Sequence, residues 1–259
     1  MIDANLSIKL AVLVGEIMLQ SGGETARIED TMLRILQKCG YGGSQIFATS
    51  TGIFASAIAE DTEQVATMIR RVPRRSNDLA KVAAVNGLSR DFVEGKIDAD
   101  EALRRLADLR RIPPYPAIVR ILGCAVASFC FASMLGGGLF DSLAAFIAAS
   151  IMQIPVLMLD RRRVAGVLVN IIGGFCGAML SLILLNAGLG EDIGSITIGA
   201  IMPLVPGVSL TNAIRDILGG DFSAGSARIM EALLVAVAIA AGVGIAMHLW
   251  VSTIGGALI

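Results

Sequence analysis

Histidine, tryptophan and tyrosine are scarce in this chain of 259 residues, which contains one His, one Trp and two Tyr. One histidine (His248) and four scattered cysteines give no ligand set with zinc spacing, so we expect no metal site. The net charge of −1 provides no basic excess to neutralise phosphates, which argues against a nucleic-acid binder. Neither a catalytic Ser-His-Asp set nor a nucleotide motif is present, so we expect a protein that is not an enzyme and has no cofactor.

Charged residues are also scarce in the second half of the chain. Thirty of residues 1–116 are charged, but only 13 of residues 117–259. The second stretch has too little charge for a surface that faces water. We therefore expect an α+β soluble domain at 1–112, followed by a transmembrane domain at 117–259 in contact with the lipid bilayer.

Five apolar segments approach or exceed the length of about 20 residues that a membrane-spanning helix needs. The expected spans are at about 117–138, 142–159, 164–187, 193–212 and 229–251. Lys and Arg occur before the first span, between the second and third, and between the fourth and fifth. By the positive-inside rule, this pattern predicts a cytoplasmic N-terminus and an outside C-terminus.

Apolar periodicity divides the first 112 residues into short elements. Residues 5–20 have the spacing of an amphipathic helix, and β-branched and aromatic residues at 45–58 indicate two strands separated at Gly52. The remaining expected elements are helices at 25–38, 76–93 and 98–110 and a third strand at 64–72. This order predicts an α+β domain.

The fourth span contains the sequence Ile-Met-Pro-Leu-Val-Pro-Gly at 201–207. Because proline removes a backbone donor and clashes with the preceding turn, we expect the helix to break near Pro206 and Gly207. Backbone groups that lose their helical hydrogen bonds inside a membrane must line a cavity or find other partners. Broken helices of this kind recur at the substrate sites of transporters. Thr211 and Asn212 follow, and we expect them to cap the restarted helix. The alternative is a kink that only shapes packing.

Charged residues follow the break. Arg215 can clamp a substrate carboxylate or simply anchor a cytosolic loop. Asp216 and Asp221 can bind an ammonium group or carry a coupling proton, although acids in loops are usually only solvated. Arg228 and Glu231 share one helix face, where they can pair, and Glu231 is the candidate proton carrier.

Asn170 is a polar residue within the third span. It either faces a substrate cavity or donates a hydrogen bond to a neighbouring helix. The predicted substrate site comprises Asn170, Pro206, Gly207, Thr211, Asn212, Arg215 and Asp216.

Several strings in this chain resemble the threonine/serine exporter family. They are Gly15-Glu16, Ser21-Gly22-Gly23-Glu24-Thr25-Ala26-Arg27-Ile28-Glu29, the run from Pro206 to Asp216, Gly220-Asp221, and the run from Gly225 to Ala232. The resemblance implies an exporter of small polar metabolites. It also implies that Glu24, Arg27 and Glu29 form a buried polar cluster or a gate. Together with Asp221, Arg228 and Glu231, these are the expected coupling or gating residues.

The chain stops after five predicted spans, whereas fused members of this family continue. It is therefore similar to the split form, in which a large YjjP-type subunit works with a small, four-span YjjB-type membrane subunit. This form implies an oligomer in a bacterial inner membrane, a substrate that is a hydroxy amino acid or a dicarboxylate such as succinate, and coupling to an ion gradient. The alternative is a membrane-anchored sensor whose soluble domain is the active part.

Overall fold

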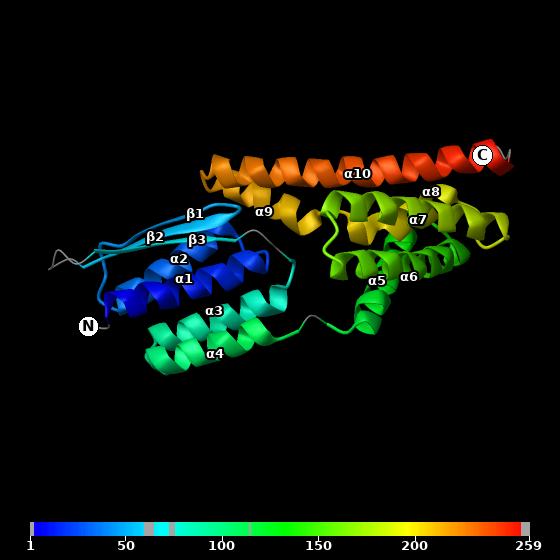
Figure 1. Cartoon of the computed structure of the whole chain (residues 1–259). Helices are drawn as coiled ribbons and strands as arrows, with labels where there is room; N and C mark the ends of the chain where they lie inside the picture. The colour runs from blue at the N-terminus through cyan, green and yellow to red at the C-terminus, as the bar shows by residue number, and fades with distance from the viewer. Residues whose placement is uncertain (1–2, 60–64, 73–75, 114, 255–259) are drawn as a thin grey trace. The chain divides into compact units, whose positions relative to one another are not determined.

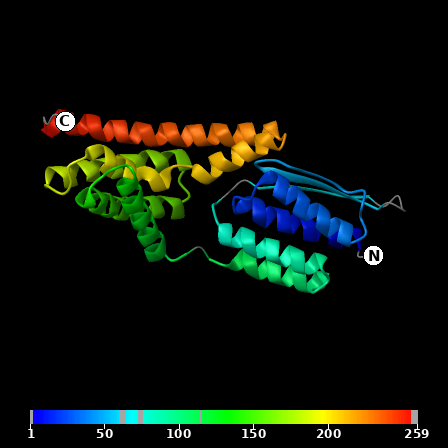
Figure 2. The same ribbon diagram turned by 180° about the vertical axis from the view of Figure 1, so that it is seen from behind.

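The computed structural model describes residues 3–59, 65–72, 76–113 and 115–254. Contacts group the chain into two compact units. We call residues 1–113 with 207–230 the head unit, and residues 114–206 with 231–259 the apolar unit. Figures 1 and 2 show the elements of both units from two sides. Residues 207–230 group with the head, although the sequence analysis had assigned them to the transmembrane domain.

The head unit is built from helices and a small antiparallel sheet, as the sequence predicted. Its first elements are α1 (Ala4–Gln20), α2 (Thr25–Lys38), β1 (Gln45–Ala48), β2 (Gly52–Ile58), β3 (Val65–Arg71), α3 (Leu79–Val93) and α4 (Ala99–Arg111). The strand order is β1-β2-β3. Gln64, at the start of the third predicted strand, lies outside the described residues.

The two faces of the sheet differ in burial. Phe47, Phe54 and Ile69 are paired across the three strands and are exposed. Ile53 and Ala55 on β2 are buried, and α1 contacts this strand. The alternation follows from the period of two along a strand, which sends successive side chains to opposite faces.

Helix α1 is buried on more than the one face that its predicted amphipathic spacing indicated. Eleven of its 17 residues are buried, because it contacts α2, two strands, α3 and α4. One of the buried residues is an acid, Glu16. Its carboxylate accepts hydrogen bonds from Arg70 of β3 at 3.1 Å and from Arg110 of α4 at 3.4 Å. Partners of opposite charge are what a carboxylate needs when it is removed from water.

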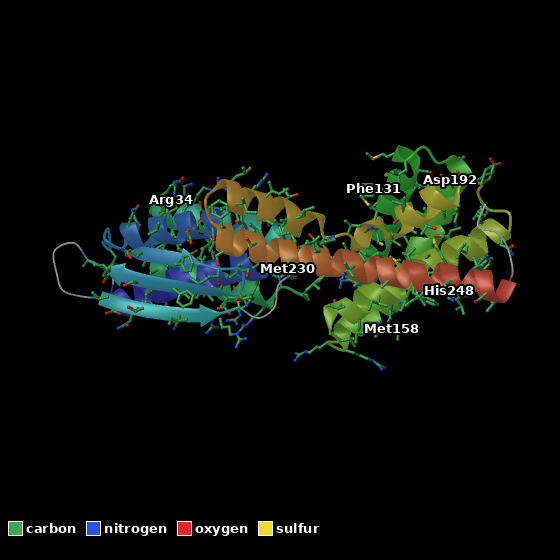
Figure 3. All side chains as sticks on the ribbon, turned by 90° about the horizontal axis from the view of Figure 1, so that it is seen from above. Arg34, Phe131, Met158, Asp192, Met230 and His248 are labelled. Atoms are coloured by element: carbon green, nitrogen blue, oxygen red, sulfur yellow. The ribbon has the colours of Figure 1, made fainter. Side chains whose placement is uncertain are left out.

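The apolar unit contains α5 (Ala117–Met134), α6 (Leu139–Arg161), α7 (Gly166–Asn186), α8 (Ile193–Ile201), the 3₁₀ helix η1 (Met202–Leu204) and most of α10 (Phe222–Ile254). Among the described residues, α5, α6, α7 and α10 are long and apolar enough to cross a membrane. Met158 of α6 extends from the helix surface in Figure 3 and is more than half exposed. Large apolar side chains on the outside of a unit are what a lipid-facing surface requires.

Helical structure is interrupted where the sequence has two prolines. Pro203 lies in η1, and Val205 is extended before Pro206. The chain becomes helical again at Gly207, where α9 (Gly207–Leu218) begins. Together, α8–η1 and α9 are apolar enough for a fifth span only as a bent pair. The structure therefore has four helices of spanning character and a candidate fifth span.

Glycines let α7 and α10 approach closely within the apolar unit. A Cβ atom on Gly174 would lie 2.5 Å from the carbonyl oxygen of Ile239, and one on Gly242 would overlap the carbonyl oxygen of Ile171. Small residues commonly allow such backbone contact between helices in membranes. Gly244 differs, because a Cβ there would meet no atom within 4 Å.

These contacts predict that Gly242→Ala destabilises the protein, since the added methyl group must push α10 away from α7. We expect a loss of roughly 1–3 kcal/mol, which is typical of overpacking, observed as a lower melting temperature in detergent. Gly244→Ala on the same helix is the matched control and should leave the melting temperature unchanged. Equal effects from the two variants would contradict the close approach at Gly242.

Candidate functional site

Two segments that lie about 190 residues apart in the sequence meet inside the head unit. The first is the loop Ser21–Glu24 with the start of α2, and the second is α9 with the first turns of α10. Both segments carry strings of the family resemblance. We call Thr25, Asn212, Asp216 and Arg228, with the carbonyl groups of Gly22 and Gly23, the Asp216 cluster.

An ion pair forms the centre of the Asp216 cluster. The Nε atom of Arg228 lies 3.0 Å from Oδ2 of Asp216, and the two side chains are 2% and 0% exposed. Thr25 donates to the carboxylate from its backbone N–H and from its hydroxyl group, at 3.3 Å each. The sequence analysis placed Asp216 in a cytosolic loop, and this was wrong, because the residue lies in α9 and is buried.

The other groups of the cluster bind the glycine loop. Arg228 donates from Nη2 to the carbonyl oxygen of Gly23 at 3.1 Å and to the Thr25 hydroxyl at 3.2 Å. Asn212 donates its amide to the carbonyl oxygen of Gly22 at 2.9 Å. Gly22 has φ +86°, which favours glycine, and a Cβ on Gly23 would lie 2.9 Å from a carbonyl oxygen of α1. The loop therefore needs both glycines to keep the conformation in which its carbonyl groups bind Asn212 and Arg228.

Other predicted site residues surround this cluster. Glu24 lies 3.6 Å from Arg215 in a more exposed ion pair. Glu29 accepts a hydrogen bond from the backbone N–H of Ala48 at 2.7 Å. Burial raises the pKa of Glu29 above its ordinary value, and the negative charges of Asp221 and Asp216 add to that rise, while the Ala48 bond opposes it.

Burial also raises the pKa of Asp216, which lies in the head unit. The positive charge of Arg228 and the two donors of Thr25 offset part of this rise. Asp221 accepts a hydrogen bond from Ala224 N–H at 2.9 Å, in the first turn of α10. An aspartate in this position is a typical N-cap, which gives Asp221 a structural role that the sequence analysis did not consider.

The prediction that Thr211 and Asn212 cap the restarted helix was wrong. Helix α9 begins four residues before Thr211, at Gly207, so both residues lie inside the helix rather than before its first turn. Thr211 instead donates its hydroxyl to the carbonyl oxygen of Gly207 within the helix, at 2.9 Å. Asn212 binds the glycine loop.

The remaining predicted residues lie on separate elements. Arg27 lines a cavity between α2 and α3 and is not part of the Asp216 cluster. Glu231 is exposed on α10, and Asn170 lies half-buried on α7 in the apolar unit. Their roles in transport remain predictions.

Sequence reasoning missed two polar residues of the apolar unit. Asp141 is 6% exposed and accepts hydrogen bonds from the backbone N–H groups of Gly138, Glu191 and Asp192. Thr197 of α8 is 3% exposed, and its hydroxyl has no hydrogen-bond partner among the described residues. A lone polar residue in an apolar segment was the only available signal for either residue.

The Asp216 cluster can hold α9 and α10 against α2, since its charges are paired and Thr25, Asn212 and Arg228 donate hydrogen bonds to acceptors within it. An arginine does not lose its proton in a protein, so Arg228 remains a fixed positive charge. Within the described part of the chain, no group of three His, Cys, Asp or Glu residues is placed to bind a metal ion.

This geometry predicts that Asp216→Asn strongly destabilises the head unit, because it leaves the buried charge of Arg228 uncompensated. Breaking a buried pair by removing one partner costs about 3–5 kcal/mol. Arg215→Gln, which breaks the more exposed pair with Glu24, is the control and should cost less than about 1 kcal/mol. Thermal unfolding of the purified full chain measures both effects.

A double variant refines this test. Asp216→Leu combined with Arg228→Met removes both charges and should recover part of the stability lost in Asp216→Asn. If Asp216→Asn were as mild as Arg215→Gln, the proposed structural role of the buried pair would be wrong.

Residues 9–250 match the family model described as putative threonine/serine exporter. The threonine/serine exporter of Corynebacterium glutamicum is 27% identical over 93% of this chain. The probable threonine/serine exporter of Mycobacterium tuberculosis is 25% identical over 92%. The probable succinate transporter subunit YjjP of Klebsiella aerogenes is 23% identical over 93%.

The chain spans 45% of the Mycobacterium tuberculosis protein and 50% of the Corynebacterium glutamicum protein, but 93% of the Klebsiella aerogenes protein. No solved structure matches it significantly. The family match extends from α1 through the glycine loop and the interrupted helix into α10. On this evidence of sequence, and with four helices of spanning character, the chain belongs to the threonine/serine exporter family.

Proposed function

We propose that this chain is a membrane-embedded transporter subunit that exports a small polar metabolite, either a hydroxy amino acid or a dicarboxylate such as succinate. The observation that carries the proposal is the hydroxyl group of Thr197, which is buried in α8 without a hydrogen-bond partner among the described residues. It lies in the helix that ends at the paired prolines, in a chain of an exporter family.

Helix α8 is enclosed by other helices of the apolar unit. It contacts α5, α6 and α7, and Ile196 and Ala200 are fully buried. A Cβ on Gly199 would lie 2.8 Å from the Cβ atom of Ala132 on α5, so the two helices are very close. Interrupted backbone at membrane depth is tolerated where protein surrounds it, and such helices form the substrate sites of many transporters.

The Thr197 hydroxyl is a candidate substrate contact for a further reason. A buried polar group without a partner costs free energy, roughly 1–3 kcal/mol. A solute with hydroxyl, ammonium or carboxylate groups offers the missing partner. We propose that Thr197, with Asn170 of α7 and the chain around Pro206 and Gly207, contributes to the substrate pathway.

The composition of the head unit supports a topology in which the chain crosses the membrane an even number of times between residues 113 and 207. Residues 207–230 group with residues 1–113 by their contacts. This supports the proposal that both segments lie on the same side of the membrane. The chain between them must therefore cross an even number of times. Helices α5, α6 and α7 account for three crossings, which requires a fourth from α8 and η1.

The proposed fourth crossing is short, and it approaches the thickness of a membrane only when the extended residues after η1 are included. Nine residues of α8 and three of η1 measure about 20 Å, and Val205 with Pro206 adds about 6–7 Å. This approaches the hydrocarbon thickness of about 30 Å. We propose that the head faces the cytoplasm, in line with the Lys/Arg distribution, and that α10 ends outside the bacterial inner membrane.

We further propose that an ion gradient drives export and that a small four-span subunit completes the transporter. Support for a partner comes from the relative described as a transporter subunit, whose length this chain nearly matches. Glu231, exposed on α10 just beyond Arg228, is the proposed proton carrier. Arg215, which is 56% exposed on α9, is the proposed contact for a substrate carboxylate.

The role of Thr197 predicts opposite effects of one substitution on stability and on transport. Thr197→Val replaces an unpartnered hydroxyl with a methyl group of similar shape, so the melting temperature should stay equal or rise. The efflux rate should fall about tenfold, because the loss of a hydrogen bond to the solute costs about 1 kcal/mol or more. Efflux from preloaded cells measures the rate.

Ser181→Ala is the matched control for that experiment. Ser181 is also fully buried in the apolar unit, but its hydroxyl donates to the carbonyl oxygen of Gly177 at 2.8 Å. Its loss should leave efflux unchanged. Unchanged efflux in Thr197→Val, with the protein present in the membrane, would refute the proposed contact.

The substrate class and the partner are tested together. Cells that lack both subunits are loaded with threonine, serine or succinate and then supplied with this chain, the small subunit, or both. We expect efflux only when both chains are present, and loss of efflux when a protonophore collapses the proton gradient. Absence of efflux for all three solutes would overturn the proposed substrate class, and efflux with this chain alone would overturn the need for a partner.

A further inference from the structure

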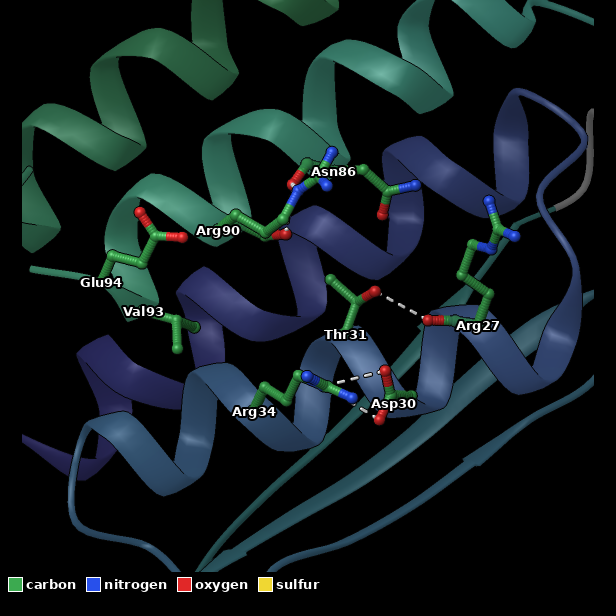
Figure 4. A pocket seen from close by; sticks show the side chains of 9 residues that line it. Arg27, Asp30, Thr31, Arg34, Asn86, Arg90, Val93 and Glu94 are labelled. Carbon is green, nitrogen blue, oxygen red and sulfur yellow. Dashed lines mark hydrogen bonds and ion pairs between the residues drawn. The ribbon is translucent and has the colours of Figure 1, made fainter. Parts of the chain in front are cut away.

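A cavity of about 550 Å³ lies in the head unit between α2 and α3. Arg27, Thr31 and Arg34 line it from α2, and Asn86, Ser89 and Arg90 line it from α3. Figure 4 shows these side chains along the space between the two helices. The spacing of three and four residues places each set on one helix face. None of them belongs to the Asp216 cluster.

The acidic side chains of the cavity are already paired. Arg34 donates from Nε to both carboxylate oxygens of Asp30, at 2.9 and 3.0 Å. Glu94, at the other end of the cavity, lies 2.6 Å from the ammonium nitrogen of Lys96. Three arginines face two acids in the lining, so the cavity keeps a net charge of +1.

Among the described residues, two guanidinium groups of the cavity have no anionic partner within ion-pair distance. Arg27 makes no side-chain hydrogen bond or ion pair with any described residue. Arg90 donates only from Nε, to the backbone carbonyl oxygen of Asn86 at 3.3 Å. Two uncompensated positive charges in a hollow attract anions, and a guanidinium group binds a carboxylate or phosphate in bidentate geometry.

We propose that this cavity binds a small dianion that bridges Arg27 and Arg90. The side-chain amide of Asn86 is the third donor. The hydroxyl groups of Thr31 and Ser89 donate to backbone carbonyl groups instead. The volume lies in the range of about 300–1,000 Å³ that is typical of small-molecule sites. None of the described residues that line the cavity is aromatic and could stack on a nucleobase, so the proposed ligand is a compact dicarboxylate or phosphate.

The site is placed to act on the rest of the head unit. Helix α2 carries Arg27 and also Thr25, whose N–H and hydroxyl groups bind Asp216 of α9. A dianion that links α2 to α3 restrains the helix on which α9 is anchored. The binding site itself does not depend on the proposed export function.

Isothermal titration calorimetry on the purified full chain tests the proposal, with succinate and inorganic phosphate as the probes. We expect saturable binding of at least one dianion. Arg27→Gln and Arg90→Gln should each weaken it about tenfold or more, which is typical for loss of a hydrogen bond to a charged group. Arg104→Gln on α4, an exposed arginine outside the cavity, is the matched control and should leave the affinity unchanged.

The two probes distinguish the sources of the dianion. Binding of succinate alone identifies a dicarboxylate site, and binding of phosphate alone identifies a phosphate site. Acetate and serine should bind more weakly than the bound dianion. Absence of binding by both dianions at millimolar concentrations, or unchanged affinity in both Arg27→Gln and Arg90→Gln, would overturn the proposal. Because no transport is measured, this result is independent of the efflux experiments.

Discussion

The ion pair between Asp216 and Arg228 constrains the arrangement of the head unit, because neither charge is stable away from water without its partner. Thr25 forms hydrogen bonds with both Asp216 and Arg228. Separation of the start of α2 from α9 would therefore remove these bonds from the two buried charges. The chain between these segments must leave the head and return to it. The same pair therefore dictates an even number of membrane crossings between residues 114 and 206 in the proposed topology.

The apolar unit obeys a different constraint, since lipid offers no hydrogen bonds to an interrupted helix. Helix α8 meets it by lying among three other helices, where Gly199 allows direct contact with α5. Gly242 gives α10 the same closeness to α7. The hydroxyl of Thr197 on the short helix α8 is buried without a hydrogen-bond partner among the described residues, which is why it carries the functional proposal.

The two faces of α2 have different electrostatics. At its start, Thr25 takes part in a cluster in which the buried charges compensate each other. On the side facing α3, Arg27 and Arg90 line a cavity and form no ion pair with a described residue. The resemblance placed Glu24, Arg27 and Glu29 in one cluster or gate. Glu24 precedes α2 and pairs with Arg215. Arg27 and Glu29 are two residues apart in the helix and therefore lie on different faces, so the three charged residues have three different surroundings.

The sequence by itself determined what depends on neighbours along the chain. Periodicity gave the helices and strands of the head, and the lack of charge after residue 116 gave the apolar helices. Two prolines marked the interruption at Val205, because proline acts on its own turn. Only the tertiary structure decided that Asp216 is buried and paired, that residues 207–230 join the head, and that Arg27 faces a cavity. The first two properties depend on contacts between segments about 190 residues apart, and the third on the packing of α3 against α2. Contacts between distant segments leave no periodic signal in the sequence.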